Sequence, residues 1–171
     1  MTNVQPPAML ATVAPPPNQF LRSDAIRSGM DLLMFAHKSH LNRADVALAA
    51  RGLGRAHHRA LYFLSRRPGQ TVGELVDTLG ITKQSFGRVK TDLERAGLIE
   101  TRKGQTDQRQ RLIYLTDVGQ KLEHDLFEQL HQNMARAYAA AGEQAVKGYW
   151  TLMQHLMDAN THSRFLAFAD Q

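Results

Sequence analysis

The fold is decided by residues 82–116, which read TKQSFGRVKTDLERAGLIETRKGQTDQRQRLIYLT. Apolar residues recur at helical spacing at Phe86, Val89, Leu93 and Ala96. Gly97 then provides a C-terminal stop, and the apolar period changes to that of strands, LIETR and RLIYLT, around a charged tip. The stretch therefore predicts a helix followed directly by a β-hairpin.

A shorter helix precedes this stretch. Thr71 and Glu74 form a capping box, and Gly80 ends the element after about two turns. Another helix, over residues 55–67, ends before Pro68, and its apolar stripe is predicted at Ala56, Ala60, Leu61 and Leu64. Two short helices joined by a tight turn and followed by a hairpin have the order of a winged helix-turn-helix.

Longer helical patterns flank this module. One runs over about 23–50; another begins after Thr116 with a spacing close to heptads, and a last helix follows Gly142 to about residue 157. The predicted fold class is mainly α with a small β-hairpin wing. The predicted organisation is a disordered proline-rich tail (1–22), a single domain (23–160) with a winged helix-turn-helix over about 55–116 and dimerisation helices over about 23–50 and 117–158, and a C-terminal tail (161–171).

The composition of the chain excludes some classes of site and favours one class of partner. The chain of 171 residues has no cysteine, which excludes disulfides and thiolate metal sites. Residues 51–111 hold 13 Lys and Arg against 6 Asp and Glu, whereas the rest of the chain is slightly acidic. A concentrated basic region favours a polyanionic partner, with DNA and a membrane surface as the alternatives. No run is long and apolar enough to span a bilayer, and no secretory signal is recognised, so we expect cytoplasmic residence.

The polar face of the predicted helix after Thr82 carries the candidate DNA contacts. Amide, hydroxyl and guanidinium groups read base edges in the major groove, whereas lysines mostly meet phosphate. We predict base readers at Gln84, Ser85 and Arg88, and phosphate contacts at Lys83, Lys90 and Thr91. The hairpin tip adds Lys103, Arg109 and Arg111, which are placed to reach an adjacent minor groove.

The order of motifs resembles the MarR family of transcriptional regulators over about residues 24–160. The specific part is Gly97-Leu98-Ile99, then Asp107-Gln108-Arg109, then Leu115-Thr116 and Gly119, similar to the family's GL(V/I), DxR and LTxxG signature. The resemblance implies that Arg109 is the wing's minor-groove arginine, that Asp107 supports it by a salt bridge, and that the protein is a homodimer formed by its first, fifth and sixth helices. The segments GRAHHRALYF (residues 54–63) and ITKQSFGRV (residues 81–89) also look like a PetP-type branch of the family.

Two positions depart from the family pattern. Gly87 stands inside the recognition helix, where glycine costs about 1 kcal/mol relative to alanine, so we expect a close approach there, to DNA or to a neighbouring helix. Gly54 stands where a capping threonine is usual.

Four histidines, His37, His40, His57 and His58, invite a metal or effector site. Structural roles are the more usual meaning, and no cysteine, H-x-x-x-H pair or carboxylate cluster completes a site, so we predict neither metal nor cofactor. The resemblance to the MarR family also implies a small-molecule effector, which the sequence does not identify.

These observations predict a sequence-specific transcriptional repressor that binds a palindromic operator in double-stranded DNA as a homodimer. The alternative is a winged-helix module that acts through protein contacts. We expect no enzyme, because no phosphate loop, nucleophile elbow or H-E-x-x-H motif is present. The apolar segment SRFLAF near the C-terminus is expected to pack on a partner protomer.

Overall fold

The computed structural model describes residues 13–169. The first twelve residues of the predicted proline-rich tail lie outside this range. Contacts group the chain into two units that meet between Ser39 and His40, and each is described by itself. The predicted single domain of residues 23–160 therefore stays a prediction.

The first unit contains an exposed segment and the start of helix α1 (Ser23–Ala49). Residues 13–22 are exposed and include a turn in which Gln19 N–H donates to Pro16 O at 3.1 Å. The apolar residues of α1 in this unit are exposed as well: Ile26, Met30, Leu32, Leu33, Met34 and Phe35.

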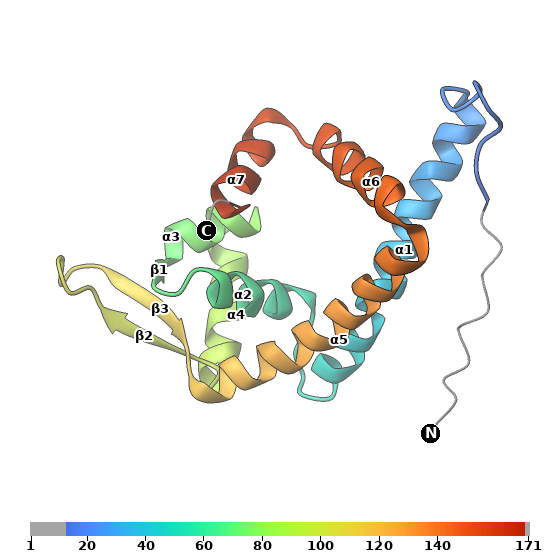
Figure 1. Cartoon of the computed structure of the whole chain (residues 1–171). Helices are drawn as coiled ribbons and strands as arrows, with labels where there is room; N and C mark the ends of the chain where they lie inside the picture. The colour runs from blue at the N-terminus through green and yellow to red at the C-terminus, as the bar shows by residue number, and fades with distance from the viewer. Residues whose placement is uncertain (1–12, 170–171) are drawn as a thin grey trace. The chain divides into compact units, whose positions relative to one another are not determined.

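The second unit holds the predicted winged helix-turn-helix. Its elements are α2 (Arg55–Arg66), β1 (Gln70–Thr71), α3 (Val72–Leu79), α4 (Lys83–Arg95), β2 (Ile99–Lys103) and β3 (Arg111–Leu115). The strands form an antiparallel sheet in the order β1-β3-β2, and β2 and β3 make the wing that projects beyond the helices (Figure 1). We call this part, residues 55–116, the winged-helix lobe.

The core of the lobe lies between its helices and the base of the sheet. Phe86, Leu61, Leu75, Leu93 and Ile113 are fully buried. They come from α2, α3, α4 and β3, and the end of α1 adds Ala44 and Leu48. The apolar period of α4 was predicted correctly, except that Ala96 is exposed.

Two local features of α2 and β1 differ from expectation. On α2, Ala56 is exposed and His58 is buried in its place, so the buried stripe begins two residues later than predicted. Strand β1 was not predicted, because two residues after a proline-glycine pair are too few to show a period. The capping box of α3 is confirmed: Glu74 N–H donates to Thr71 Oγ1 at 3.2 Å, and Gly80 ends the helix at φ 64°.

The root of the wing is fixed to the next helix, α5 (Asp117–Ala141). Thr116 N–H donates to Leu98 O at 3.1 Å, Thr116 Oγ1 donates to Gly97 O at 2.6 Å, and Gly119 N–H donates to Thr116 Oγ1 at 3.0 Å. A Cβ on Gly119 would collide with the Leu98 carbonyl, so this close approach requires glycine.

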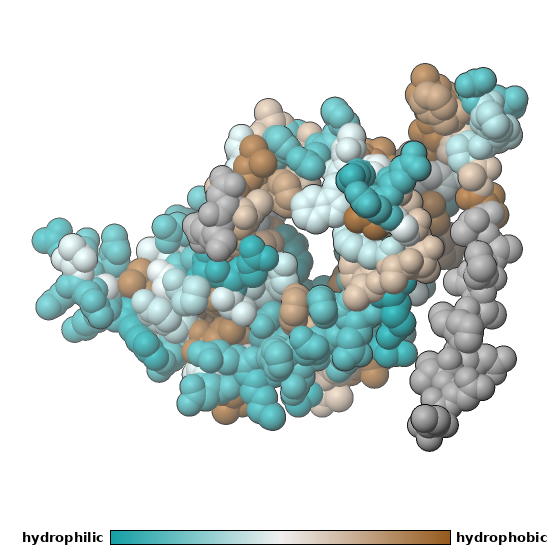
Figure 2. Space-filling view, in the orientation of Figure 1, coloured by the Kyte–Doolittle hydropathy of each residue, from teal (hydrophilic) through white to brown (hydrophobic). Residues whose placement is uncertain are grey.

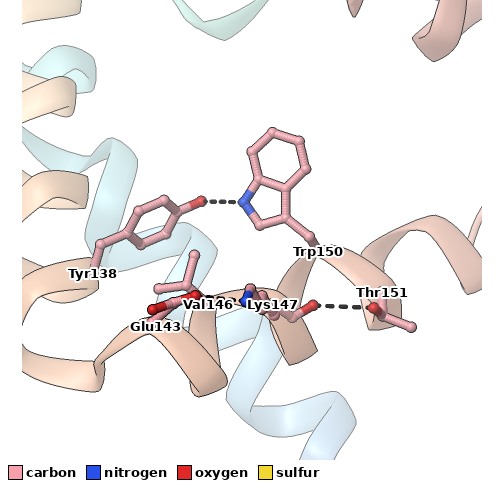
Figure 3. Close-up of a pocket in the computed structure, with 6 residues that line it drawn as sticks. All are labelled: Tyr138, Glu143, Val146, Lys147, Trp150 and Thr151. Carbon is pink, nitrogen blue, oxygen red and sulfur yellow. Dashed lines mark hydrogen bonds and ion pairs between the residues drawn. The ribbon is translucent and has the colours of Figure 1, made fainter.

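Two helices follow α5: α6 (Glu143–His155) and α7 (Ala159–Ala169). At the corner between α5 and α6, the indole N–H of Trp150 donates to Tyr138 Oη at 3.2 Å beside an open hollow (Figure 3). Most of α7 falls in the segment expected to be a tail. Its side chains pack on the chain's own α2, where the Phe168 and Phe63 rings meet edge to face at 5.2 Å.

Candidate DNA interface

The recognition helix α4 begins at a well-formed cap. Ser85 N–H donates to Thr82 Oγ1 at 3.1 Å, and the Thr82 hydroxyl donates to Ser85 Oγ at 2.9 Å. Phe86, Val89 and Leu93 fix the rotation of the helix by their burial. The opposite face is consequently held towards solvent.

That exposed face carries side chains free to accept a new partner. Lys83, Gln84 and Arg88 are exposed and make no hydrogen bond or ion pair with any residue between 13 and 169. A guanidinium and an amide with unused donors are the groups that bond bidentately to guanine and adenine in the major groove. The two predicted readers Gln84 and Arg88 are therefore available for contact.

Three other predicted contacts already have partners within α4. Lys90 Nζ lies 2.5 Å from Glu94 Oε1, Thr91 Oγ1 donates to Gly87 O at 2.9 Å, and Ser85 accepts from Thr82. Lys90 is also only partly exposed. To reach a phosphate, Lys90 would have to exchange its carboxylate partner for that phosphate.

Gly87 lies at the centre of the exposed face. A Cβ built there meets no atom within 4 Å, so no neighbouring helix within the described residues requires glycine. Of the two reasons expected from the sequence, the close approach of an external ligand remains.

The wing tip, residues 104–110, is a tight turn. Gly104 N–H donates to Gln110 O at 3.2 Å and Gln110 N–H donates to Asp107 O at 3.0 Å. A Cβ on Gly104 would lie 2.6 Å from Asp107 O, so a larger residue would open the turn. The Asp107 carboxylate accepts from the main-chain N–H of Arg109 at 2.9 Å.

Asp107 thus supports the tip through the main chain. The resemblance implied a salt bridge to the Arg109 guanidinium, but within the described residues that guanidinium has no partner and stays exposed. Arg111 folds back instead, because its Nη1 donates to Gln108 O at 2.8 Å. Lys103, the Cα partner of Arg111 across the hairpin, is exposed. Figure 2 shows hydrophilic side chains covering this end of the molecule.

Two acidic residues that the sequence analysis did not single out join α4 to its neighbours. Glu94 accepts from Lys90 and, at 3.1 Å, from Thr101 Oγ1 on β2. The Asp92 carboxylate lies 3.4 Å from Arg95 Nη1 within α4 and 3.4 Å from Nε2 of His57, which belongs to α2. The i,i+4 spacing of Lys90 and Glu94 is the signal that could have identified the first of them.

Two of the four histidines, His57 and His40, have structural partners, whereas His37 is exposed. His57 Nδ1 accepts from Gly54 N–H at 3.0 Å, which is the reciprocal half of a capping box, while Gly54 itself offers no side chain to cap α2. His40 lies 3.1 Å from Asn133. Burial lowers the pKa of His58. The Asp45 carboxylate raises this pKa to a smaller extent, and His40 lowers it to a still smaller extent. Within residues 13–169, no group of three or more acidic or histidine residues could hold a metal ion, and no helix is long and apolar enough to cross a membrane.

Comparison with known proteins extends these observations. The model of the MarR family matches residues 51–110, which run from just after α1 to the wing tip. Over 139 residues, the chain is 42% identical to the HTH-type transcriptional regulator PetP of Rhodobacter capsulatus, an alignment that covers 81% of this chain and 84% of PetP.

Solved structures share the fold. The crystal structure of a MarR family transcription regulator superposes with a TM-score of 0.68 at 19% identity, covering 87% of this chain and 95% of that chain. CouR from Rhodococcus jostii bound to p-coumaroyl-CoA gives 0.61 at 21% identity (73% and 88%), and NadR in complex with 4-hydroxyphenylacetate gives 0.61 at 22% identity (72% and 88%). These structures show the shared fold, and the PetP relative and the family match show that this chain belongs to the MarR family of winged-helix, HTH-type transcriptional regulators.

Proposed function

We propose that the protein is a repressor that binds a palindromic DNA operator as a homodimer and is released by a small-molecule effector. The observation that carries the DNA-binding part is the exposed face of α4, where Gln84 and Arg88 have unused donors around Gly87. A helix face of this kind fits the major groove. CouR has also been solved as a transcriptional repressor bound to a 23-mer DNA duplex.

In this proposal, the exposed side chains divide into two kinds of DNA contact. Gln84, Ser85 and Arg88 read bases, whereas Lys83, Lys90 and Thr91 contact phosphate. Lys103 and Arg111 belong to the hairpin that reaches the adjacent minor groove. Arg109 enters the adjacent minor groove from the tip that Asp107 holds.

Exposed apolar residues support the homodimer. The face of α1 from Ile26 to Phe35 is 45 to 73% exposed, and on α6 Trp150 and Leu152 are 50% and 57% exposed. Apolar residues gathered at this density on helices outside a core mark a protein interface. A twofold dimer would present two recognition helices to half-sites about 10 base pairs apart.

The effector is proposed by analogy with relatives of the same fold. NadR and CouR were solved with 4-hydroxyphenylacetate and p-coumaroyl-CoA, respectively. Because the protein would act on DNA, we propose that it works in the cytoplasm.

Selection of bound sequences from a random duplex pool tests the DNA-binding proposal. A palindromic site is expected, with affinity for the selected duplex that falls steeply as salt rises, since each neutralised phosphate contributes a slope of about −0.9 to the log–log plot. The alternative, a winged-helix module for protein contacts, predicts no enriched sequence and little affinity at any salt.

A further inference from the structure

The last turn of the recognition helix α4 carries two acidic residues, Asp92 and Glu94. A carboxylate near a helix C-terminus is unfavourable, because that end of the helix dipole is negative. The rest of α4 holds no acidic residue, and Lys83, Arg88 and Lys90 lie on it. The two carboxylates therefore oppose both the helix and its contact with a polyanion, unless their own partners offset this cost.

Each of the two acids follows a basic residue by one helical turn, but they treat that residue differently. Lys90 Nζ lies 2.5 Å from Glu94 Oε1, and the Lys90 side chain is 24% exposed. Asp92 follows Arg88 at the same i,i+4 spacing, but its carboxylate lies 3.4 Å from Arg95 instead. Within residues 13–169, Arg88 consequently has no partner.

This difference separates two kinds of DNA contact. An arginine that bonds to base edges distinguishes sequences, and Arg88 is available to do so. A lysine that meets phosphate binds every sequence alike, and Lys90 is held by a carboxylate of its own helix. The free protein therefore offers a group that reads sequence and withholds a group that does not.

We propose that Glu94 is a specificity-determining residue, which lowers the affinity for non-specific DNA by keeping Lys90 from phosphate until the operator is bound. Glu94 acts through Lys90 and contacts no base. This inference rests on the proposed DNA-binding function and adds to it the control of one phosphate contact.

Electrostatics explains why the exchange of partners depends on sequence. Attraction between basic side chains and phosphates supplies essentially all of non-specific binding. A Lys90 that Glu94 already neutralises adds nothing to it, and moving Lys90 to a phosphate would leave a carboxylate without its cation close to the DNA backbone. On the operator, base contacts by Gln84 and Arg88 hold α4 in one position in the groove, so that Lys90 meets its phosphate in a fixed geometry and the gain outweighs this cost.

Thr101 of strand β2 gives Glu94 a second partner. Its hydroxyl donates to Glu94 Oε1 at 3.1 Å, and this is the same oxygen that Lys90 contacts. The hydrogen bond does not depend on Lys90, so the carboxylate stays bonded to the wing after the lysine has left. Thr101 thereby reduces the cost of releasing Lys90 on the operator.

The salt dependence of binding to random duplex and to the selected duplex tests this role. Glu94→Gln removes the charge but keeps an oxygen that can accept from Thr101. On random duplex, we expect it to steepen the log–log slope by about 0.9, which is one phosphate contact, and to raise the affinity about eightfold at roughly 0.1 M salt. Lys90→Gln should reduce the slope on the selected duplex by about 0.9 and leave the slope on random duplex unchanged.

The matched control is Asp77→Asn. It removes the same charge from an exposed residue of α3 that forms no ion pair within the described residues, and it should change neither slope. An unchanged slope on random duplex for Glu94→Gln, or an equal loss of slope on both duplexes for Lys90→Gln, would overturn the role of Glu94. If the wild-type protein binds no duplex, the proposed function fails and this role with it, whereas binding with unchanged slopes in both variants overturns the role of Glu94 alone.

Discussion

The winged-helix lobe and the helices outside it differ in the kind of side chain that they expose to solvent. In the lobe, Phe86, Leu61 and Leu93 are fully buried, and the face left to solvent carries Gln84 and Arg88. On the N-terminal part of α1 and on α6, large apolar residues are themselves exposed, such as Phe35 at 73% and Leu152 at 57%.

This difference distinguishes two kinds of partner. A region that buries its own apolar residues and exposes unused hydrogen-bond donors has a surface suited to DNA. A region that exposes leucine, methionine and aromatic residues has a surface suited to another protein chain.

The largest effect is expected for Phe86→Ala. Removal of a fully buried ring should reduce the free energy of unfolding by about 3 to 5 kcal/mol. The matched control is Phe20→Ala, which removes the same ring from a site that is 62% exposed and lies outside the expected interface, and it should cost less than about 1 kcal/mol. Urea unfolding at one protein concentration measures both, and similar losses would break the comparison.

The next effect concerns the outer helices. Leu152→Asp should weaken the homodimer by at least about 2 kcal/mol, because it buries an unpaired charge in the expected interface. Val118→Asp adds the same charge at an exposed apolar residue in the first turn of α5, where an acid is tolerated. Sedimentation equilibrium gives the dissociation constants; a Leu152→Asp protein that stays as dimeric as wild type would contradict the assignment.

On the exposed face of the lobe, Arg88→Ala should cost about 1 to 3 kcal/mol of operator affinity and relax specificity at one base pair. Arg109→Ala should weaken binding more evenly across sequences. Titration of matched and mismatched operators separates the two results. Equal losses on both operators for Arg88→Ala would remove its reader role.

Gly87→Ala should act in opposite directions on folding and on binding. Alanine is favoured in a helix by about 0.5 to 1 kcal/mol, and there is open space for its Cβ, so the variant should unfold at higher urea. If DNA approaches the backbone closely there, operator affinity should fall. A more stable variant with wild-type affinity would show that the site has room for a methyl group.

The smallest effect is expected from pH. The pKa of buried His58 is lowered from the ordinary value of 6.5, so below pH 6.5 the unfolded chain binds more protons than the folded chain does. The contribution of neutral His58 is therefore complete above pH 6.5 and declines as pH falls below it. In His58→Gln, the unfolding free energy measured from pH 7.5 to 5 should depend less on pH.

Much of the lobe could be predicted because its signals are local. Thr71 with Glu74 and Thr82 mark helix starts, and the buried period of α4 sets its rotation. The predictions failed where tertiary contact decides. His58 occupies a buried position that a hydrophobic pattern assigns to Ala56, and α7 is held by arginines of α2 that are about 100 residues away in the chain.

The residues of the candidate DNA interface also form two groups, those that the sequence predicts and those that it does not. Which residues of α4 face solvent follows from the helical period, so Gln84 and Arg88 could be found from the sequence. Which exposed side chains already have partners depends on rotamers. The fold-back of Arg111 onto Gln108 O and the bond from Asp107 to the main chain of Arg109 belong to this second kind.

The junction at Thr116 has a consequence for the timing of local unfolding. One residue there joins the end of α4, the wing and the first turn of α5, through Gly97, Leu98 and Gly119. Opening any one of these elements breaks hydrogen bonds that belong to the others, so their amide protons should exchange with solvent together, as one cooperative unit. The wing of this protein would then lose its order at the same rate as the base of α5, and its tip alone would exchange faster.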